Sequence, residues 1–537
     1  MARKGSAVGS LGAVSRRAVL AICVIVLVAA GGVFLLTRGR GDEERAAVSD
    51  PLAEALGYAP ASAELVAALE VQKGSPQGEA LRELARTFPA ARFGADAVRT
   101  GARNLGFDAD ADLPSLLGGP IVLAGPAAAV TKLAGTATAG LALDLTPVLR
   151  AGAIAAVVGR STDDVAAVMR RAVDDGRLTK LPALSPGVAQ YRLPNGAGVV
   201  AVRDADIVLA GDSARLKQAV ALRDRQGGLT RATFEQRLGN VPQPALILAT
   251  AQPRALVGAA AKGVPWVDAL RGGAVSVRLA DPGVRVRLHL ATDPAALRPQ
   301  DLPLAPGAAP PTPAAGAAQI YAGVRNLSQT IRVLDASRDT LQLPFLGSVT
   351  DALKTLDSIK GPLKTFGRID VDQALLDQLT GTTTITQEAN GVALRGELTD
   401  GGPLRTALNR IASIPDFAID AANFTDLDLD KAGDDAYEVR RKGTTFLKVA
   451  VLGTTLVVTN DLAASLRRIA DRPTRRVTST GPLTFHAEGR AIQDQLVQRL
   501  GLPGLARLIL GGFGDLDGSA TSTLASTDID ATLVLER

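Results

Sequence analysis

A chain of 537 residues, 47% of them hydrophobic and 21% charged, is too apolar to be intrinsically disordered and long enough for more than one domain. Its formal net charge of +5 is small for this length, and no cluster of basic and aromatic residues occurs, which argues against nucleic-acid binding. Aromatic residues make up only 3%, so Ala, Val and Leu have to fill most of the core.

The beginning of the chain predicts a membrane anchor. Residues 18–36 carry no charge and, as a helix, would extend about 28 Å, close to the thickness of the hydrocarbon core of a bilayer. A cleaved signal peptide is the alternative, but such signals have an apolar region of about 7–15 residues before a small-x-small site. This run is longer and ends in Val33-Phe34-Leu35-Leu36, so we expect an uncleaved transmembrane helix.

Flanking charges predict the orientation of the anchor. Arg3, Lys4, Arg16 and Arg17 precede the apolar run, and positive residues favour the cytoplasmic side of a membrane. We therefore expect a single-pass protein of the cell membrane with most of its chain outside the cytoplasm. The expected order is a cytoplasmic tail at 1–17, the transmembrane anchor at 18–36 and a stalk at 37–60.

The rest of the chain predicts two repeated halves, 61–297 and 317–537, joined by a Pro/Ala-rich linker at 298–316. In each half, a meander of three strands leads into a helix. The first meander turns at Asn195-Gly196, a strong hairpin signal, and Asp212 or Ser213 can cap the helix that follows. The second meander has strands at 437–439, 445–451 and 456–459, followed by a helix capped by Asn460 or Asp461 and ending near Ala470.

The match between the halves continues on both sides of the meander. Upstream, a helix opened by Ser161 corresponds to a helix at 403–411, and downstream, helices at 254–261 and 490–500 correspond. Each half closes with alternating strands, at 275–279, 284–290 and 529–535. Alternation predicts sheets with one buried and one wet face, which means mainly antiparallel pairing. The expected fold class is α+β, two repeated halves of mainly antiparallel sheet with covering helices; whether the halves share one sheet stays open.

Two segments resemble a known family. Residues 55–67, ALGYAPASAELVA, read as a Pro-Ala opening followed by a first strand, and residues 113–119, LPSLLGG, come later in the same half. Together with the anchor, they resemble the bacterial domain-of-unknown-function family 3352. The resemblance covers most of residues 50–300 and, more weakly, the second half. It implies a bacterial, membrane-anchored and functionally unassigned protein, and it brings no catalytic residues with it.

The residues that usually carry chemistry are sparse. The chain has two histidines, His289 and His486, each in or beside a strand and without the neighbours of a zinc site, so we expect partly exposed strand histidines. Ser213, in Gly211-Asp212-Ser213-Ala214-Arg215, lies between a strand and a helix but lacks the second glycine of a nucleophile elbow, which favours a helix cap.

Two acidic runs and one aromatic residue have a functional alternative. Residues 426–430, DLDLD, begin like a calcium loop, but the sixth and twelfth positions hold Lys431 and Tyr437 instead of Gly and Glu. Residues 107–112, FDADAD, are similar, and we expect solvated turns or an exposed strand in both runs. The only tryptophan, Trp266, is expected in the core more than on a lipid- or partner-facing surface.

These observations favour a non-enzymatic binding or scaffold protein of the bacterial cell envelope. We expect no catalytic, cofactor or metal site, and partners among envelope proteins, lipids or wall components, with the membrane contacted through 18–36. The alternative function is a carrier of lipid or another apolar ligand in a cleft between the two halves. An enzyme is the third possibility and needs carboxylates such as Asp108 or Asp112 brought together with a distant partner.

Overall fold

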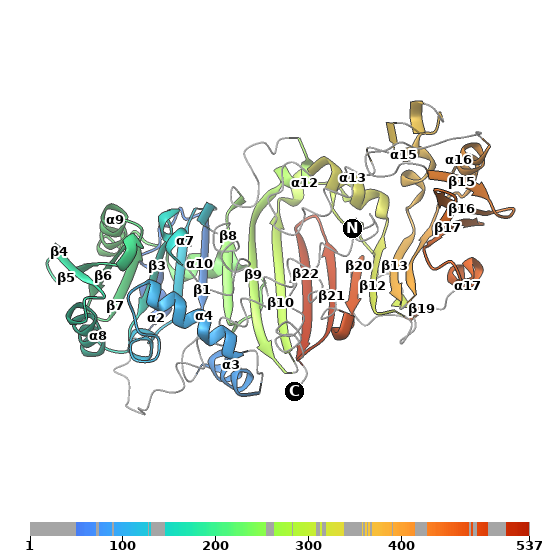
Figure 1. Cartoon of the computed structure of the whole chain (residues 1–537). Coiled ribbons are helices and arrows are strands. Elements are labelled where there is room, and N and C mark those ends of the chain that lie inside the picture. The colour runs from blue at the N-terminus through green and yellow to red at the C-terminus, as the bar shows by residue number, and fades with distance from the viewer. Residues whose placement is uncertain are drawn as a thin grey trace.

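The computed structural model describes residues 50–70, 75–87, 91–126, 128–129, 145–253, 263–281, 283–307, 312–313, 318–337, 357, 360–361, 363–365, 368–388, 390–413, 427–471, 474–475, 481–491 and 512–535. Within these residues the fold is α+β, dominated by one twenty-stranded antiparallel sheet that runs through the whole molecule (Figure 1). No helix among the described residues is long and apolar enough to cross a membrane, and the expected anchor at 18–36 lies outside them.

Pairing of neighbouring strands gives the order of the sheet from one edge to the other. The first ten strands are β4 (Thr179–Ser185), β5 (Val188–Arg192), β6 (Val199–Arg203), β7 (Asp206–Ala210), β3 (Ile154–Val158), β2 (Ile121–Gly125), β1 (Leu65–Leu69), β8 (Ile247–Ala251), β9 (Leu270–Ala280) and β10 (Gly283–Thr292). The next ten are β22 (Ser526–Leu535), β21 (Phe513–Ser522), β20 (Leu483–Ala487), β12 (Ile320–Arg325), β13 (Thr382–Glu388), β14 (Gly391–Glu397), β18 (Thr455–Thr459), β17 (Thr444–Leu452), β16 (Ala436–Arg441) and β15 (Leu427–Lys431).

The two parts of the chain meet where β10 pairs with β22. Nine residue pairs, from Gly283 opposite Val534 to Ala291 opposite Ser526, join them, so the sheet is continuous across this junction. Outward from the junction, the strands follow the same order along the chain on both sides. Strands β10, β9, β8, β1, β2 and β3 on one side correspond to β22, β21, β20, β12, β13 and β14 on the other.

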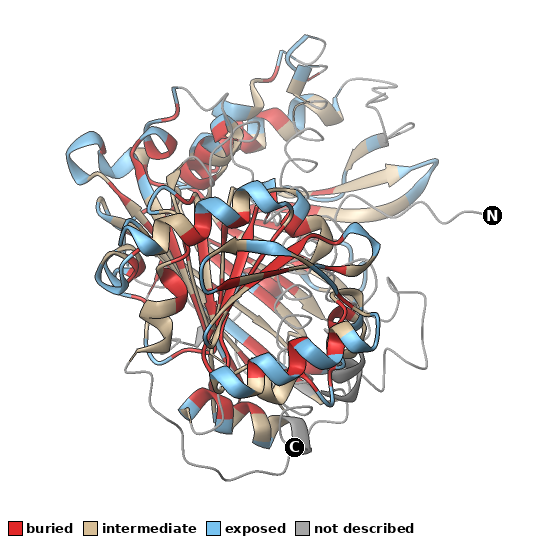
Figure 2. Ribbon diagram, turned by 90° about the vertical axis from the view of Figure 1, so that its left-hand side faces the viewer, coloured by how far each residue is buried: buried red, intermediate tan, exposed pale blue. Residues whose placement is uncertain are grey.

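Helices cover both faces of the first part of the sheet, where every residue of β3 is buried (Figure 2). One face packs against α2 (Pro51–Leu56), α9 (Ser213–Asp224) and α10 (Arg231–Leu238), whose Leu56, Leu216 and Phe234 are completely buried. The opposite face packs against α4 (Ala91–Asn104), α5 (Leu113–Leu116) and α8 (Thr162–Asp174). Small side chains on the strands allow this close approach, because Ala and Val dominate β3 and β6.

The second part repeats this covering with fewer helices. On one face, Leu404 of α16 (Gly402–Ala412) packs with Leu456 and the buried Tyr437. On the other, Ile469 of α17 (Leu466–Ala470) packs with Val457. Among the described residues, the other helices with defined ends are α3 (Pro76–Thr87), α7 (Thr146–Arg150), α12 (Pro265–Asp268), α13 (Leu327–Ser337) and α15 (Val371–Ala374), and the 3₁₀ turns are Pro194–Gly196, Pro294–Ala296, Pro299–Asp301 and Leu376–Gln378. A second small sheet pairs β11 (Thr312–Pro313) with β19 (Thr474–Arg475).

The described part of the expected linker at 298–316 is packed against the protein. Leu302 and Leu304 are 1% and 6% exposed. The side-chain amide of Gln329, on α13, donates hydrogen bonds to the carbonyl groups of Pro299 (2.8 Å) and Leu302 (2.9 Å). These contacts tie the segment that follows the first part to a helix of the second.

Most predicted helices that fall on described residues are confirmed. The predicted first residue of one helix, α17, is wrong. Ser161 caps α8, Asp212 caps α9, and α16 covers the helix expected at 403–411. The helix expected after Asn460 begins only at Leu466, where Ser465 provides the cap, because Asp461 instead accepts a hydrogen bond from Ala463 N–H in a turn. The helix expected at 254–261 lies outside the described residues, as does 490–500 beyond Ala491.

Candidate functional site

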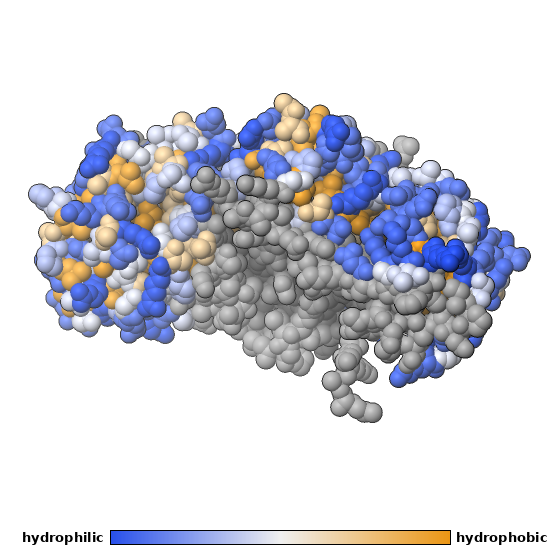
Figure 3. Space-filling view, turned by 90° about the horizontal axis from the view of Figure 1, so that it is seen from above, coloured by the Kyte–Doolittle hydropathy of each residue, from blue (hydrophilic) through white to orange (hydrophobic). Residues whose placement is uncertain are grey.

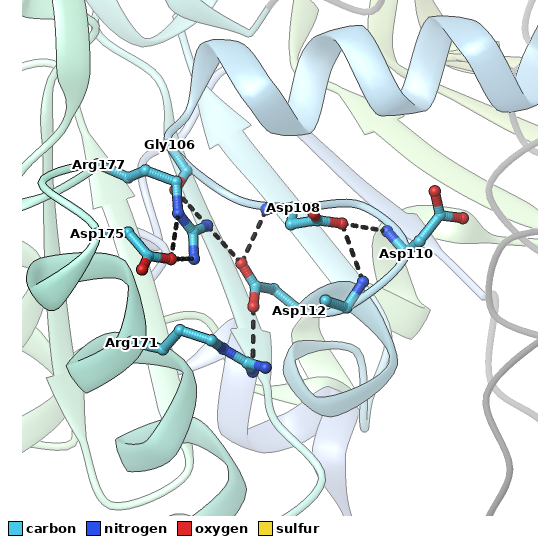
Figure 4. Close-up of polar contacts among 8 residues, drawn as sticks. Gly106, Asp108, Asp110, Asp112, Arg171, Asp175 and Arg177 are labelled. Carbon is cyan, nitrogen blue, oxygen red and sulfur yellow. Dashed lines mark hydrogen bonds and ion pairs between the residues drawn. The ribbon is translucent and has the colours of Figure 1, made fainter.

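The acidic run 107–112 is built around one buried carboxylate (Figure 4). Asp112 is 0% exposed and lies 2.7 Å from Nη1 of Arg177 and 3.2 Å from Nη2 of Arg171. Its Oδ2 also accepts a hydrogen bond from the backbone N–H of Asp108 (2.8 Å). Arg177 donates further hydrogen bonds to the carbonyl of Gly106 and to Asp175. The cluster therefore fastens the loop before α5 to helix α8.

The other two carboxylates of this run have separate local partners. Asp108 Oδ1 accepts the backbone N–H groups of Asp110 and Ala111, which forms a turn, and Asp110 pairs with Arg99 (3.1 Å) on the surface. The three carboxylates thus bind backbone N–H groups and arginines, and they do not converge on one shared position where a metal ion could bind. Among the described residues, no group of three His, Cys, Asp or Glu side chains could hold a metal ion.

The second acidic run, 426–430, lies on the outer strand β15 from Leu427 onward, and Asp426 lies outside the described residues. Asp430 pairs with Arg440 of the neighbouring strand β16 (2.6 Å). This is the exposed strand that the alternation of Leu and Asp predicts.

Ser213 belongs to the first turn of α9, as the capping interpretation predicts. Asp212 Oδ1 accepts the N–H of Arg215 (2.9 Å), and Ser213 Oγ accepts a hydrogen bond from the side-chain amide of Gln190 (2.7 Å). A nucleophilic serine needs a base as its hydrogen-bond acceptor, and an amide donor does not provide one.

Trp266 lies in the core, as expected, and is 4% exposed. It belongs to a cluster with Val264, Leu270, Leu290 and Leu302 beside the end of β10. Its indole therefore stabilises the end of the central strands and offers no exposed aromatic surface.

Both histidines lie on strands, and each has an aspartate directly opposite on the neighbouring strand. His289 on β10 faces Asp528 on β22, and His486 on β20 faces Asp517 on β21; each Nδ1 is 2.8 Å from a carboxylate oxygen. Because an ionised carboxylate can only accept, both imidazoles donate through Nδ1. Sequence inspection identified the histidines as strand residues but missed the two aspartates, whose places depend on strand register.

The register places the histidines on the same face of the four central strands. One row of directly opposed residues reads Arg285, Thr532, Asp517 and His486, and the next rows contain Arg287 with Asp530 and His289 with Asp528. We call these eight residues the central polar face. The other face of the same strands is apolar and carries buried Val284, Leu533 and Leu516.

The central polar face is open to solvent at the Arg285 end and closed at the His289 end. The side chains of Asp517 and Asp530 are 62% and 54% exposed, whereas those of His289 and Asp528 are 14% and 15% exposed. Arg287 links the charges, 3.5 Å from Asp528 and 3.8 Å from Asp530. Burial by itself raises the pKa of Asp528, but hydrogen bonds from His289 and Ser526 bring this pKa below its usual value.

Ser526, Asp528 and His289 have the residue types of a hydrolase triad but not its order. Ser526 Oγ donates to Asp528 Oδ2 (2.8 Å), and His289 binds the other oxygen of the same carboxylate. In a triad, the histidine stands between the serine and the acid and removes the serine proton. Here the carboxylate of Asp528 lies between Ser526 and His289 and accepts a hydrogen bond from each, so the three residues stabilise the pairing of β10 with β22.

The hydrogen bond from His486 to Asp517 is the main cause that raises the pKa of His486 above 6.5. Replacing Asp517 with asparagine is therefore expected to lower this pKa, measured by NMR titration of a ¹³C-histidine-labelled sample. Because the folded pKa is raised, the pair stabilises the protein below pH 6.5 and loses this contribution as the pH rises through the folded pKa. The second resonance, from His289, is the internal control, and an unchanged His486 titration in the variant would contradict the pairing.

A further buried polar contact was not expected from the sequence. The hydroxyl of Tyr58, which is 1% exposed, donates to Asp206 Oδ2 (2.7 Å) across the first part of the fold. Burial raises the pKa of Asp206, and the hydrogen bond from Tyr58 partly counteracts this rise. Nothing in the linear sequence pairs Tyr58 with Asp206.

Replacing Tyr58 with phenylalanine is expected to lower the free energy of unfolding by about 1–3 kcal/mol at pH 7, because a partly buried carboxylate loses its donor. The folded pKa of Asp206 then rises further, so the loss should be smaller at pH 4, where this carboxylate takes up a proton. Urea unfolding at the two pH values measures both effects. Tyr191→Phe is the matched control, since the pKa of Tyr191 is raised by burial without a side-chain hydrogen bond; equal losses in the two variants would refute the role of the hydroxyl.

Comparison with known proteins adds little. The sequence matches no family model and no curated protein. A solved structure, crystal form III of TP0453, is similar to 44% of this chain and 79% of its own chain, at 8% sequence identity and a TM-score of 0.25. A similarity at this level supports no statement about function.

Proposed function

We propose that the protein is a non-enzymatic binding or scaffold protein of the bacterial cell envelope. Residues 18–36 anchor it in the cell membrane, and the sheet lies outside the cytoplasm. Support for the location comes from the uncharged run and its flanking arginines, and the resemblance to family 3352 agrees with it.

The central polar face is the observation that carries the binding role. Its charged groups stand on strands that are hydrogen-bonded on both sides, so their positions are fixed before any partner arrives. Asp517 and Asp530 remain more than half exposed, which leaves charge available to a partner. With strands about 4.8 Å apart, the four strands that carry these residues span about 14 Å, measured across the strands.

We also infer that the chain arose by internal duplication. The support is the common order of strands on the two sides of the junction, with α8 and α16 covering one face and α9 and α17 the other. In this interpretation the halves are related by a pseudo-twofold axis near the pairing of β10 with β22, and the central polar face forms where they meet.

Site-specific photocrosslinking in intact cells tests the binding role. A photoreactive residue at position 517 or 530 is expected to capture an envelope component, while the same residue at Asp110 or Asp175, which are similarly exposed, is expected not to. Equal capture at all four positions, or none, would contradict a partner at the central polar face. Hydrolytic or transferase activity of the purified full chain that resists mutation of this face would contradict the non-enzymatic role.

The single cysteine makes the location testable. In a Cys23→Ser background, a cysteine introduced at Asp110 is expected to react with a membrane-impermeant maleimide in intact spheroplasts, and one introduced at Gly5 only after lysis. The reverse pattern would contradict the proposed orientation.

A lipid carrier stays the alternative function. The junction between the two parts is a strand pair of nine residues, so a ligand would have to lie against a face of the sheet. Among the described residues, Leu462 is the one large hydrophobic residue classed as exposed. Hydrophilic and hydrophobic residues are mixed over the described surface seen from above (Figure 3). Native mass spectrometry of the protein purified from envelopes distinguishes the two, since a stoichiometric bound lipid would favour the carrier.

A further inference from the structure

Two arginines stand directly opposite each other at one end of the central polar face. Arg278 on β9 pairs in register with Arg285 on β10, so their side chains project from the same face of the sheet. Arg285 is exposed and Arg278 is partly buried. The Nε of Arg278 is shielded from solvent without a hydrogen-bond partner, and within the described residues neither side chain makes an ion pair.

This arrangement is unfavourable without a counter-charge. Like charges directly opposite each other in a sheet destabilise it, and a shielded donor without an acceptor adds a desolvation penalty. The acidic groups nearby have other partners, since Asp528 and Asp530 pair with Arg287, and Asp517 accepts from His486. Asp281, in the turn between the two strands, also has an interaction of its own.

The backbone around the pair is held in place. Strands β9 and β10 pair with each other along their length. The pairing of β9 with β8 ends at Val277, and a side chain continues the hydrogen bonding beyond that residue. The buried side chain of Gln77 accepts the N–H of Leu279 (2.8 Å) and donates to its carbonyl (3.2 Å), and so continues the ladder beside Arg278. The Cα and Cβ atoms of the two arginines are therefore held at fixed positions, which limits where their side chains can reach.

We propose that Arg278 and Arg285 form a binding site for a phosphate group. Directly opposed residues have Cβ atoms about 5 Å apart, so both planar guanidinium groups can reach one tetrahedral oxyanion. Arginine forks bind phosphate oxygens in pairs, and the hydroxyl-bearing Thr532 is the next residue in the same row. The proposal rests on the proposed binding role in that it names the ligand class for the same surface.

Titration of the full-length protein in nonionic detergent with inorganic phosphate, at constant ionic strength against chloride, tests the site. Calorimetry is expected to show saturable binding that weakens at least about tenfold in Arg278→Gln and in Arg285→Gln. Arg271→Gln is the matched control, because Arg271 is on the same strand, 64% exposed and paired with Asp293; it should bind as the unmodified protein does. Absence of saturable binding, or equal binding in all variants, would overturn the proposal.

A second measurement separates binding from folding. Without phosphate at low salt, Arg285→Gln should melt at the same temperature as the unmodified protein or higher, since it removes a repulsion. With phosphate, only the unmodified protein and the Arg271 variant should gain thermal stability. A lower melting temperature of Arg285→Gln without phosphate would show that Arg285 stabilises the fold and would overturn the proposal.

The source of the phosphate is resolved with a short-chain lipid. If dihexanoyl phosphatidylglycerol, below its micellar concentration, binds more tightly than inorganic phosphate and depends on Arg285, the ligand is a lipid headgroup. If it binds no better, the ligand is a soluble phosphate compound. If crosslinking at positions 517 and 530 fails while phosphate still binds, only the proposal of an envelope partner is refuted. If phosphate does not bind while crosslinking succeeds, only the phosphate site is refuted.

Discussion

Replacing Asp112 with alanine is expected to lower the free energy of unfolding by about 3 kcal/mol, since it leaves Arg177 without its buried counter-charge. The side chain of Asp112 is fully buried, and that of Arg177 is 26% exposed, so solvent screens this pair only partly. The substitution also removes the acceptor of the Asp108 N–H, which holds the loop before α5. Urea unfolding followed by circular dichroism measures the loss. The free energy of unfolding of Asp112→Asn is expected to lie between those of the unmodified protein and Asp112→Ala.

Asp110 is the matched control for this prediction. It belongs to the same acidic run, is 52% exposed and pairs with Arg99 on the surface, where an ion pair contributes little. Asp110→Ala should therefore change the free energy of unfolding by less than about 0.5 kcal/mol. Similar values for the two variants would show that the buried cluster does not fasten the loop.

Replacing Gly283 with alanine is expected to destabilise the junction between the two parts of the sheet, by about 3 kcal/mol. A Cβ at this position would lie 1.9 Å from the carbonyl oxygen of Leu533, on the paired strand β22. The overlap is with backbone, so no side-chain rotation relieves it, and β10 has to move away from β22. Differential scanning calorimetry should show a lower transition temperature, or two transitions where the unmodified protein has one.

Gly227 provides the control for the glycine substitution. A Cβ there would meet no atom closer than 3.7 Å, and Gly227 is absent from the residues with positive φ, so Gly227→Ala should be neutral or slightly stabilising. If Gly283→Ala melts as Gly227→Ala does, the close pairing at the end of β10 does not exist in solution.

Local signals in the sequence predicted local structure well. The alternation in 284–290, the caps Ser161 and Asp212, and the exposed strand in 427–430 depend on neighbours along the chain, and the structure confirms them. Strands β2, β4, β12, β13 and β21 were missed. Strand β13 is a run of threonines without apolar alternation, and β4 contains Pro182, which suits an outer strand but weakens a strand prediction.

The candidate site was less accessible to sequence reasoning for a physical reason. His289 and Asp528 are separated by more than two hundred residues, and only the register of β10 with β22 makes them neighbours. A shift of one residue would move Asp528 to the apolar face, so the pair is a property of the sheet and not of either segment. The same holds for Arg278 and Arg285, which face each other only through the register of β9 with β10.

The pairing of β10 with β22 also has a consequence for biogenesis. As the chain emerges, β10 is complete at Thr292, but its partner begins only at Ser526, so one edge of the growing sheet stays open during this interval. Open edges invite association with other chains, and charged side chains on an edge strand discourage it. Arg285 and Arg287 thus shield a nascent edge before they become part of a finished surface, and closure of the sheet awaits synthesis of its last strand.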